Sequence, residues 1–286
     1  MRRLTVPTFL ALVLLCICIT GCQTYSPSFR QVRASARQGN AYAQCDIGMM
    51  CREGDGVEQS DKEAFYWFEK SAKQGNANAQ YNLGEMYYFG RSVTGDYKEA
   101  FKWYKKSADK GHAQAQCEVG CMYSSDNKGV EKNYRKALSW FAKSAEQGNA
   151  KAQYNLGKMY YFGEGVARDH RQAFSWYKKA AEQGDANAQY CTGMMCYNGE
   201  GVARDYKEAM KWYLKSSEQG HAEAQYRLEW MCYNDEGIGK DGDCSGSTKI
   251  HRMPLLVNTK LQKHVKNAKN QKLLRANKGR NERVKK

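Results

Sequence analysis

Residues 145–169, AEQGNAKAQYNLGKMYYFGEGVARD, recur in near copy about every 36 residues along the chain. The dipeptide Ala-Gln and a later tryptophan recur with the same period. The glutamines are Gln44, Gln80, Gln116, Gln153, Gln189 and Gln225, and the tryptophans are Trp67, Trp103, Trp140, Trp176 and Trp212. One spacing is 37, and its extra residue falls near Ser124 to Asn127. A fixed period of this length is typical of stacked two-helix units.

Each copy contains the end signals of two helices. A glycine such as Gly75 follows the second helix and suits a left-handed helix end, and a capping residue such as Asn76 then starts the first helix of the next copy. The second helix starts at a polar residue, with Glu or Gln three positions later in four of five copies, which is a capping box. These residues are Ser60, Asp96, Asn133, Asp169 and Asp205. The pattern predicts an all-α array of about five helix pairs of 36 to 37 residues.

Both ends of the array depart from the pattern. Ser26-Pro27 followed by Phe29 to Gln38 predicts a lone helix that covers the first pair. At the other end a first helix starts at His221, but Glu229 replaces its glycine, and no second helix is recognisable after Gly239.

The first helix of each copy has a glycine in its middle, where glycine costs about 1 kcal/mol relative to alanine. The recurrence of this glycine predicts that a Trp or Tyr of a neighbouring helix approaches the backbone there. The second helix carries a charged stripe and is predicted to be the outer helix. The glycines are Gly48, Gly84, Gly120, Gly157 and Gly193.

The string A-x-A-Q-x-x-L-G-x-M-Y, followed by G-x-G-V-x-x-D, A-x-x-W-Y-x-K and Q-G, resembles the Sel1-like repeat, a relative of the tetratricopeptide repeat, over about residues 40–239. Two loops depart from it, because Ser92 replaces a glycine and the third loop has only Gly129. The resemblance implies a right-handed α-solenoid whose first helices line a concave groove that binds proteins.

Residues 1–21 have the pattern of a signal peptide, since Arg2 and Arg3 precede an apolar run that is short for a membrane span. The segment ending in Cys22 resembles the bacterial lipobox, in which the cysteine receives a diacylglycerol, and Gln23 resembles the pattern of lipoproteins sorted to an outer membrane. We therefore expect an exported, lipid-anchored protein of the cell envelope, on the outer membrane facing the periplasm. An ordinary signal peptide or a plain N-terminal anchor are the alternatives. Residues 22–28 form a linker and residues 29–239 the solenoid.

Residues 240–286 form a basic tail. Within it, residues 246–286 hold 13 Lys and Arg and one acidic residue, Glu282, so that +12 of the chain's net charge of +15 lies there. Val257, Leu261 and Val265 fall at helical spacing among lysines, a pattern that favours an anionic membrane or envelope polymer. Nucleic acid is less favoured, because the tail has no aromatic residue to stack on bases. Disorder and a reading-frame accident remain open alternatives.

Candidate partner-binding positions are those that differ among copies and lie on the groove row of the first helix. Their mixture of polar residues with Met and Trp favours a protein or peptide partner over a small closed pocket, with Trp230 as the preferred anchor. The alternative is that these are solvated positions that vary freely. The residues are Asp46, Met49, Asn82, Glu85, Glu118, Asn155, Lys158, Met194, Arg227 and Trp230.

A β-lactam-binding or β-lactamase-like activity is the alternative function, because a cysteine-rich branch of the resembled family is associated with it. Ser107-x-x-Lys110 and Ser175-x-x-Lys178 match a Ser-Lys nucleophile pattern, and Ser125-Asp126-Asn127 matches a second lactamase motif. Chance accounts for two such pairs, no Lys-Thr-Gly is present, and no general base pairs with a nucleophile.

We therefore predict a non-enzymatic scaffold without catalytic residues, cofactor or metal. The regular cysteine pairs of that branch are missing here. Most of the eight cysteines after Cys22 are predicted to be small apolar substitutes, several at tyrosine positions. Cys117 and Cys121 stand at i, i+4 but have no further ligands at metal spacing.

Overall fold

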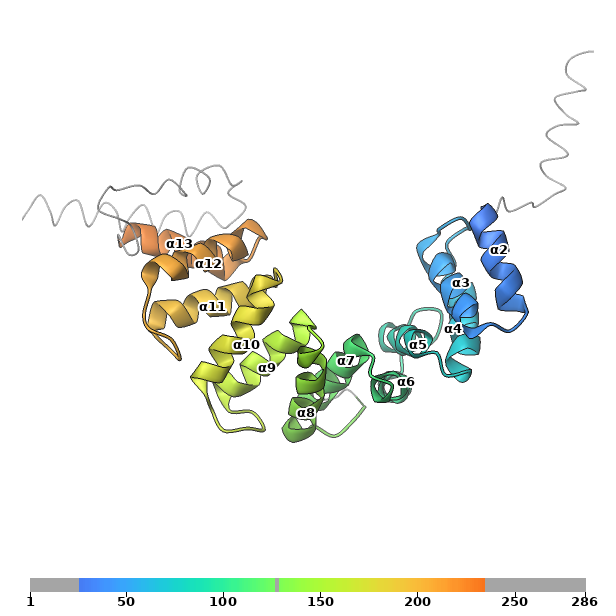
Figure 1. Ribbon diagram of the computed structural model, residues 1–286, viewed down its shortest axis with the longest axis horizontal. Helices are drawn as coiled ribbons and strands as arrows, with labels where there is room; N and C mark the ends of the chain where they lie inside the picture. The colour runs from blue at the N-terminus through green and yellow to red at the C-terminus, as the bar shows by residue number, and fades with distance from the viewer. Residues whose placement is uncertain (1–25, 127–128, 235–286) are drawn as a thin grey trace, which may run out of the picture. The chain divides into compact units, whose positions relative to one another are not determined.

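The computed structural model describes residues 26–126 and 129–234. The predicted signal peptide, Cys22 and the basic tail lie outside these residues. The described chain is all α, and its twelve helices are shown in Figure 1. They are α2 (Pro27–Arg37), α3 (Ala41–Glu53), α4 (Asp61–Lys73), α5 (Ala77–Phe89), α6 (Tyr97–Asp109), α7 (Ala113–Ser124), α8 (Tyr134–Glu146), α9 (Ala150–Phe162), α10 (His170–Glu182), α11 (Ala186–Asn198), α12 (Tyr206–Glu218) and α13 (Ala222–Tyr233). The predicted array of five helix pairs with a helix at each end is confirmed.

The chain divides into two compact units, Met1–Gln147 and Gly148–Lys286. In the first, α3 packs on α4, α5 on α6 and α7 on α8, while α2 covers α3. In the second, α9 packs on α10 and α11 on α12, and α13 follows α12. Within each unit successive pairs also contact each other, so the core is a continuous layer between neighbouring helices, as expected for stacked repeats.

The predicted caps are confirmed at both kinds of helix start. Asn76 Oδ1 accepts from the Ala79 amide at 3.0 Å, and Asp96 Oδ1 accepts from the amides of Lys98 and Glu99 at 2.8 and 3.1 Å. Ser26 caps α2 in the same way, with proline at its first position. These bonds satisfy amides that would otherwise lack partners and set where each helix begins.

The mid-helix glycines lie against aromatic rings, as predicted. A Cβ at Gly84 would stand 2.6 Å from Cδ1 of Tyr104, and a Cβ at Gly120 would stand 2.7 Å from Cδ1 of Phe141. The ring is always that of the residue after the tryptophan, which the sequence pattern alone did not distinguish. In α13 this glycine is replaced by Glu229, and the described residues contain no following helix whose ring would approach the backbone there.

The glutamine of the recurrent Ala-Gln dipeptide makes the same hydrogen bonds in successive copies, which we call the glutamine ladder. Gln44 Nε2 donates to the carbonyl of Ala36 at 3.1 Å, and Gln189 Nε2 donates to the carbonyl of Ala181 at 3.2 Å. A glutamine at the end of the second helix then donates to the buried glutamine, as Gln74 does to Gln44 Oε1 at 2.7 Å. Buried amides must be paired to avoid a desolvation cost, so these bonds specify the packing of each copy.

The loop between the two helices of a copy requires left-handed backbone. Gly56, Gly165 and Gly201 have φ of +69°, +73° and +70°. Ser92, at the same place in the second copy, has φ of +63°, a conformation that costs about 1–2 kcal/mol for a residue with a Cβ. The departure noted in the sequence is therefore a strained position and not a different loop.

Candidate functional site

The predicted groove row of the first unit lies on three helices. Asp46 and Met49 are on α3, Asn82 and Glu85 on α5, and Glu118 on α7. Asp46 is exposed and Asn82 is buried, while the other three are half-buried. Helices α3 and α5 contact each other directly, so residues from successive copies are neighbours on this face.

Arg52, which was not among the predicted site residues, joins three of them. Its Nη1 donates to Asn82 Oδ1 at 2.7 Å and lies 3.4 Å from Glu85 Oε2, and its Nη2 lies 3.1 Å from the Met49 sulfur. The guanidinium therefore links α3 to α5 and holds the buried Asn82 in place. The signal in the sequence was a departure from three of the other copies, which have Tyr88, Tyr161 and Tyr197 at this position, while the third copy has Ser124.

The phenol of Tyr81 joins this network close to the carboxylates of Glu85 and Glu118. Tyr81 donates its hydroxyl hydrogen to Glu85 Oε1 at 2.9 Å, and its ring stacks on His112 with centroids 4.9 Å apart. Burial, together with the charges of Glu85 and Glu118, raises the pKa of Tyr81, so its hydroxyl remains a donor. Glu53 and Glu85 each lie 3.4 Å from the Arg52 guanidinium, and Asp46 and Glu118 are further carboxylates of the row on this face.

The row of the second unit has a different chemistry. Asn155 and Lys158 lie on α9, Met194 on α11, and Arg227 and Trp230 on α13. Lys158 is exposed, Met194 is half-buried, and Trp230 is 44% exposed. The row is therefore basic and apolar where that of the first unit is acidic.

Arg227 does not stand alone in the second unit. Its guanidinium interacts electrostatically with Tyr190 of α11, and the Tyr190 ring stacks on His221 with centroids 4.8 Å apart. Tyr190 was missed because it matches Tyr81 and Tyr154, and identical letters in several copies indicated a purely structural role. The structure brings Arg227 to this ring pair.

The serine pairs have structural surroundings. The Ser107 side chain is buried and donates to the carbonyl of Ala77 at 2.7 Å, and Lys110 Nζ donates to the carbonyl of Gly75 at 2.6 Å. Ser71, Ser144 and Ser216 make the same bond in their copies. Ser175 is exposed on α10, and Asn127 of the second motif lies outside the described residues. Because the same serine hydroxyl bonds to a backbone carbonyl in four copies, the role of Ser107 is structural.

The seven cysteines within the described ranges are not in disulfides, namely Cys45, Cys51, Cys117, Cys121, Cys191, Cys196 and Cys232. Burial raises the pKa of Cys45, Cys51 and Cys196 to about 11 each, which keeps these thiols protonated and weakly nucleophilic. In the described part of the chain no three His, Cys, Asp or Glu side chains gather as a metal site would require.

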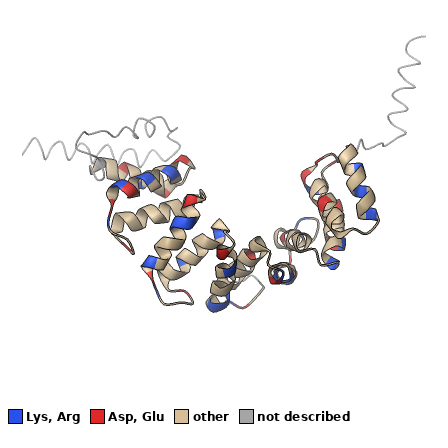
Figure 2. Ribbon diagram, in the orientation of Figure 1, with Lys and Arg blue, Asp and Glu red and all other residues tan. Residues whose placement is uncertain are grey.

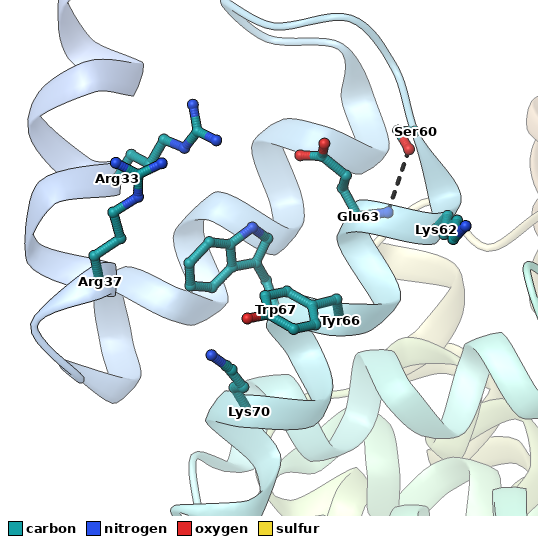
Figure 3. Close-up of a pocket in the computed structure, with 8 residues that line it drawn as sticks. All are labelled: Arg33, Arg37, Ser60, Lys62, Glu63, Tyr66, Trp67 and Lys70. Carbon is teal, nitrogen blue, oxygen red and sulfur yellow. Dashed lines mark hydrogen bonds between the residues drawn. The ribbon is translucent and has the colours of Figure 1, made fainter.

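A hollow of about 640 Å³ lies between α2 and α4. Figure 3 shows Arg33 and Arg37 on the α2 side, with Tyr66, Trp67 and Lys70 of α4 facing them. Lys70 Nζ lies 4.5 Å from the centroid of the Tyr66 ring, a cation–π distance. Ser60, Lys62 and Glu63 complete the lining. The sequence did not predict this hollow, because the segment of α2 was interpreted only as a helix that covers the first helix pair.

Among the described residues, no helix combines the length and the apolar character that crossing a membrane requires.

Comparisons with known proteins agree with the repeat architecture. The chain is similar to the crystal structure of c5321, a protective antigen of uropathogenic Escherichia coli displaying an SLR fold, with 37% identity and a TM-score of 0.70. That match covers 75% of this chain but only 46% of the antigen, so this chain spans less than half of its length. A Sel1 repeat protein from Oxalobacter formigenes is 32% identical with a TM-score of 0.66, over 74% of this chain and 86% of that one. No curated protein matches.

The family model of the Sel1 repeat matches five consecutive segments, which coincide with the helix pairs described above. They are residues 41–76, 77–112, 113–149, 150–185 and 186–221. These five repeats cover well over half of the sequence, so the chain belongs to the Sel1 repeat family.

Proposed function

We propose that this protein is an exported, lipid-anchored scaffold of the cell envelope that binds a protein or peptide along the row of its first helices. Sel1 repeat proteins are generally protein-interaction scaffolds. The proposed anchor is a diacylglycerol on Cys22, with the outer membrane, facing the periplasm, as the location.

One observation carries the proposal, namely the division of each copy into a constant part and a variable part. The glutamine ladder, the glycine–aromatic contacts and the buried serines repeat from copy to copy. The groove row changes instead, from Asp46 and Glu118 in the first unit to Lys158 and Trp230 in the second. Positions that the fold leaves open to change are where specificity for a partner can reside.

The variable positions also have the character of binding hot spots. Arg52 is hydrogen-bonded and lies over the Phe68 ring, which fixes its orientation before any partner arrives, and Arg227 interacts with Tyr190. An ordered arginine loses little side-chain entropy on binding, and Trp230 offers exposed aromatic area. No observation favours a β-lactam site, since Ser107 is bonded within the fold.

The test is photo-crosslinking in intact cells. A photoreactive amino acid replaces Asp46 or Lys158, which are exposed on the row, and in control variants replaces Lys102 or Lys211, which are exposed on second helices. We expect one partner to be crosslinked from the row positions and not from the controls. Equal crosslinking from both sets, or none from the row, would contradict the groove assignment.

Two substitutions test the anchor residues of the second unit. Arg227→Ala and Trp230→Ala should each lower the affinity for the captured partner by about tenfold or more, as truncation of a hot-spot residue does. Lys211→Ala, at an exposed position on a second helix, serves as the control and should leave the affinity unchanged. An unchanged affinity in both variants would mean that the α13 end of the row does not take part.

The lipid anchor is tested separately. Wild-type protein should incorporate radiolabelled palmitate and fractionate with outer membranes, and Cys22→Ala should abolish both, because one acyl-bearing residue supplies the membrane affinity. Retention of label in the variant would refute the anchor without affecting the groove proposal.

A further inference from the structure

Helix α2, which forms one wall of the hollow, differs in charge from the second helices of the later copies. Helix α2 aligns with the second helices of the repeats, so that Arg33 and Arg37 correspond to Glu69 and Lys73 of α4. In α4 these two positions form an ion pair at 2.8 Å. The equivalent positions form ion pairs in α6, Lys105–Asp109 at 2.6 Å, and in α10, Lys178–Glu182 at 3.9 Å. In α8 and α12 they hold Ala142 with Glu146 and Leu214 with Glu218, so each of these helices keeps one carboxylate there.

In α2, both members of this pair are cations. The helix sequence, PSFRQVRASAR, contains three arginines and no acidic residue, and Figure 2 shows it with blue segments and no red. Arg33 and Arg37 are one turn apart and therefore lie on the same face of the helix. In the described part of the chain no carboxylate lies within ion-pair distance of Arg37 or Lys70. The ion pair that neutralises these two positions in α4 is thus absent from α2, where Arg33 and Arg37 place two positive charges on one face.

The hollow combines this charge with aromatic surface. Tyr66 is 48% exposed and forms the opposite wall together with Trp67, as Figure 3 shows. Glu63 is the single carboxylate in the lining, against the four cations Arg33, Arg37, Lys62 and Lys70. A surface of this kind complements a ligand that has several negative charges and an apolar side chain between them.

The arrangement fits separated carboxylates better than a single compact phosphate. The arginines stand on one helix and Lys70 on another, so the cations are distributed over both walls of the hollow. The positive end of α4 is already neutralised, because Asp61 and Glu63 lie in its first turn and the Glu63 amide is bonded to Ser60 Oγ at 3.2 Å. A phosphate group would meet these carboxylates instead of free amides.

We propose that the hollow between α2 and α4 binds an acidic segment of a partner protein, with carboxylates on Arg33 and Arg37 and an aromatic side chain against Tyr66 and Trp67. This site is separate from the groove row, so either can fail without the other. It would give the scaffold a second point of attachment, next to the N-terminal end of the repeats.

The probe is a labelled peptide, Glu-Asp-Phe-Glu-Asp, with benzoylphenylalanine in place of phenylalanine for crosslinking. Full-length protein is used, and mass spectrometry locates the crosslink, because the basic tail would also attract an acidic peptide. We expect modified residues within 33–37 and 66–70. Crosslinks confined to the tail would overturn the proposal.

The decisive variant is Arg37→Glu, which rebuilds in α2 the opposite-charge pair found in α6. Since Arg37 is exposed, the melting temperature should not change. We expect about a tenfold loss of peptide affinity at near-physiological salt, as for removal of a complementary charge at an interface. Lys207→Glu makes the same charge change on the exposed surface of α12 and should leave the affinity unchanged.

Two further arms identify the ligand class. The peptide with all acids replaced by their amides should not bind, and inorganic phosphate or vesicles containing phosphatidylglycerol should not compete at the hollow. Equal losses in Arg37→Glu and Lys207→Glu would show that only overall charge matters and would overturn the proposal. Competition by phosphate or vesicles that depends on Arg37 would overturn the assignment to a peptide.

Discussion

One buried atom distinguishes the second copy from the others. Gln80 is 4% exposed and its Oε1 has no hydrogen-bond partner. In the other copies this oxygen accepts from a glutamine at the end of the second helix, as Gln116 does from Gln147 at 2.7 Å. Lys110 stands at that place in the second copy, and its ammonium bonds to the carbonyl of Gly75 instead. An unpaired buried acceptor costs about 1–3 kcal/mol.

Lys110→Gln should therefore stabilise the protein by about 1 kcal/mol. Gln219 shows that one glutamine can serve both acceptors, since its Nε2 bonds to Gln189 Oε1 at 2.8 Å and to the carbonyl of Gly184 at 2.9 Å. The free energy of unfolding in urea measures the gain. Gln147→Lys is the converse variant and should lose a similar amount, and a neutral result in both would refute this account of Gln80.

A second residue makes the stability of the fold depend on pH. His112 Nδ1 accepts the Ala115 amide at 3.2 Å, which requires neutral imidazole, and burial lowers the pKa of His112. A group whose folded pKa is depressed contributes its full stability above the unfolded pKa of about 6.5 and loses it as the pH falls toward the folded value. The cap at His112 is thus complete at neutral pH and weakened in acid.

The stability difference between wild type and His112→Asn should consequently change with pH. Asparagine caps the equivalent helices at Asn76 and Asn149 without titrating near neutrality. We expect the variant to lose less stability than the wild type between about pH 7 and about pH 5, because other groups titrate alike in both proteins. Urea midpoints at the two pH values measure this, and parallel losses would contradict it.

At the scale of the helix, the contact between a glycine and a ring determines how closely the two helices of a copy pack. Gly84 and Tyr104 illustrate it, since Tyr104 is 2% exposed and packs in a filled layer. The ring cannot move away from an added methyl group without disturbing its neighbours. The spacing of the pair therefore rests on the absence of one carbon atom.

Gly84→Ala should destabilise the protein by about 1–3 kcal/mol, although alanine favours helix formation, because overpacking outweighs propensity. Thermal denaturation measures the loss. The double variant Gly84→Ala with Tyr104→Leu tests the cause, since the two changes should not be additive if the methyl group meets the ring. Strict additivity would place the effect elsewhere.

The helices could be predicted from sequence because their signals are local and repeated. Caps such as Asp96 and left-handed glycines such as Gly75 mark the helix ends within a few residues. The identity of the ring against each glycine could not be predicted, since Trp103 and Tyr104 are adjacent and helical periodicity does not resolve one position. The contacts of Arg52 with Asn82 and Glu85 could not be predicted either, because they depend on how two successive copies pack.

At the scale of the molecule, stability is distributed over contacts between neighbours. Within each unit the helices contact mainly the ones next to them in the chain, apart from α3 with α5. Arrays with this contact pattern lose structure from the least supported elements, because each repeat is held by its neighbours. The end helices α2 and α13 have fewer such neighbours among the described residues.

Hydrogen exchange should therefore be faster in α2 and α13 than in α5 and α11. Amide exchange followed by mass spectrometry on the full chain measures the difference, and α5 and α11 are internal references, one from each unit. Uniform protection from end to end would indicate a single cooperative fold and contradict this expectation.

The candidate site was less predictable than the fold. The groove row could be listed because it follows helical spacing, but its charge networks depend on long side chains from adjacent copies, such as Arg52 with Glu85. The hollow beside α2 is a feature of the folded chain, and its unusual charge is seen when Arg33 and Arg37 are compared with the equivalent residues of the second helices. Both proposed binding surfaces are defined by positions that differ among the copies, such as Arg52 and Arg37, and not by the positions that recur.

The glutamine ladder bears on how such a chain can grow. Gln44, Gln80, Gln116 and Gln189 each bond backward to a carbonyl of the preceding copy in the same way, so a copy ends with the groups that the next copy needs. Tandem duplication of residues 150–185 would join two ends that already match, and the gene could lengthen without inventing a new junction. Residues 77–112 would be a poorer template, because each duplicate would carry the unmet acceptor of Gln80 along with it.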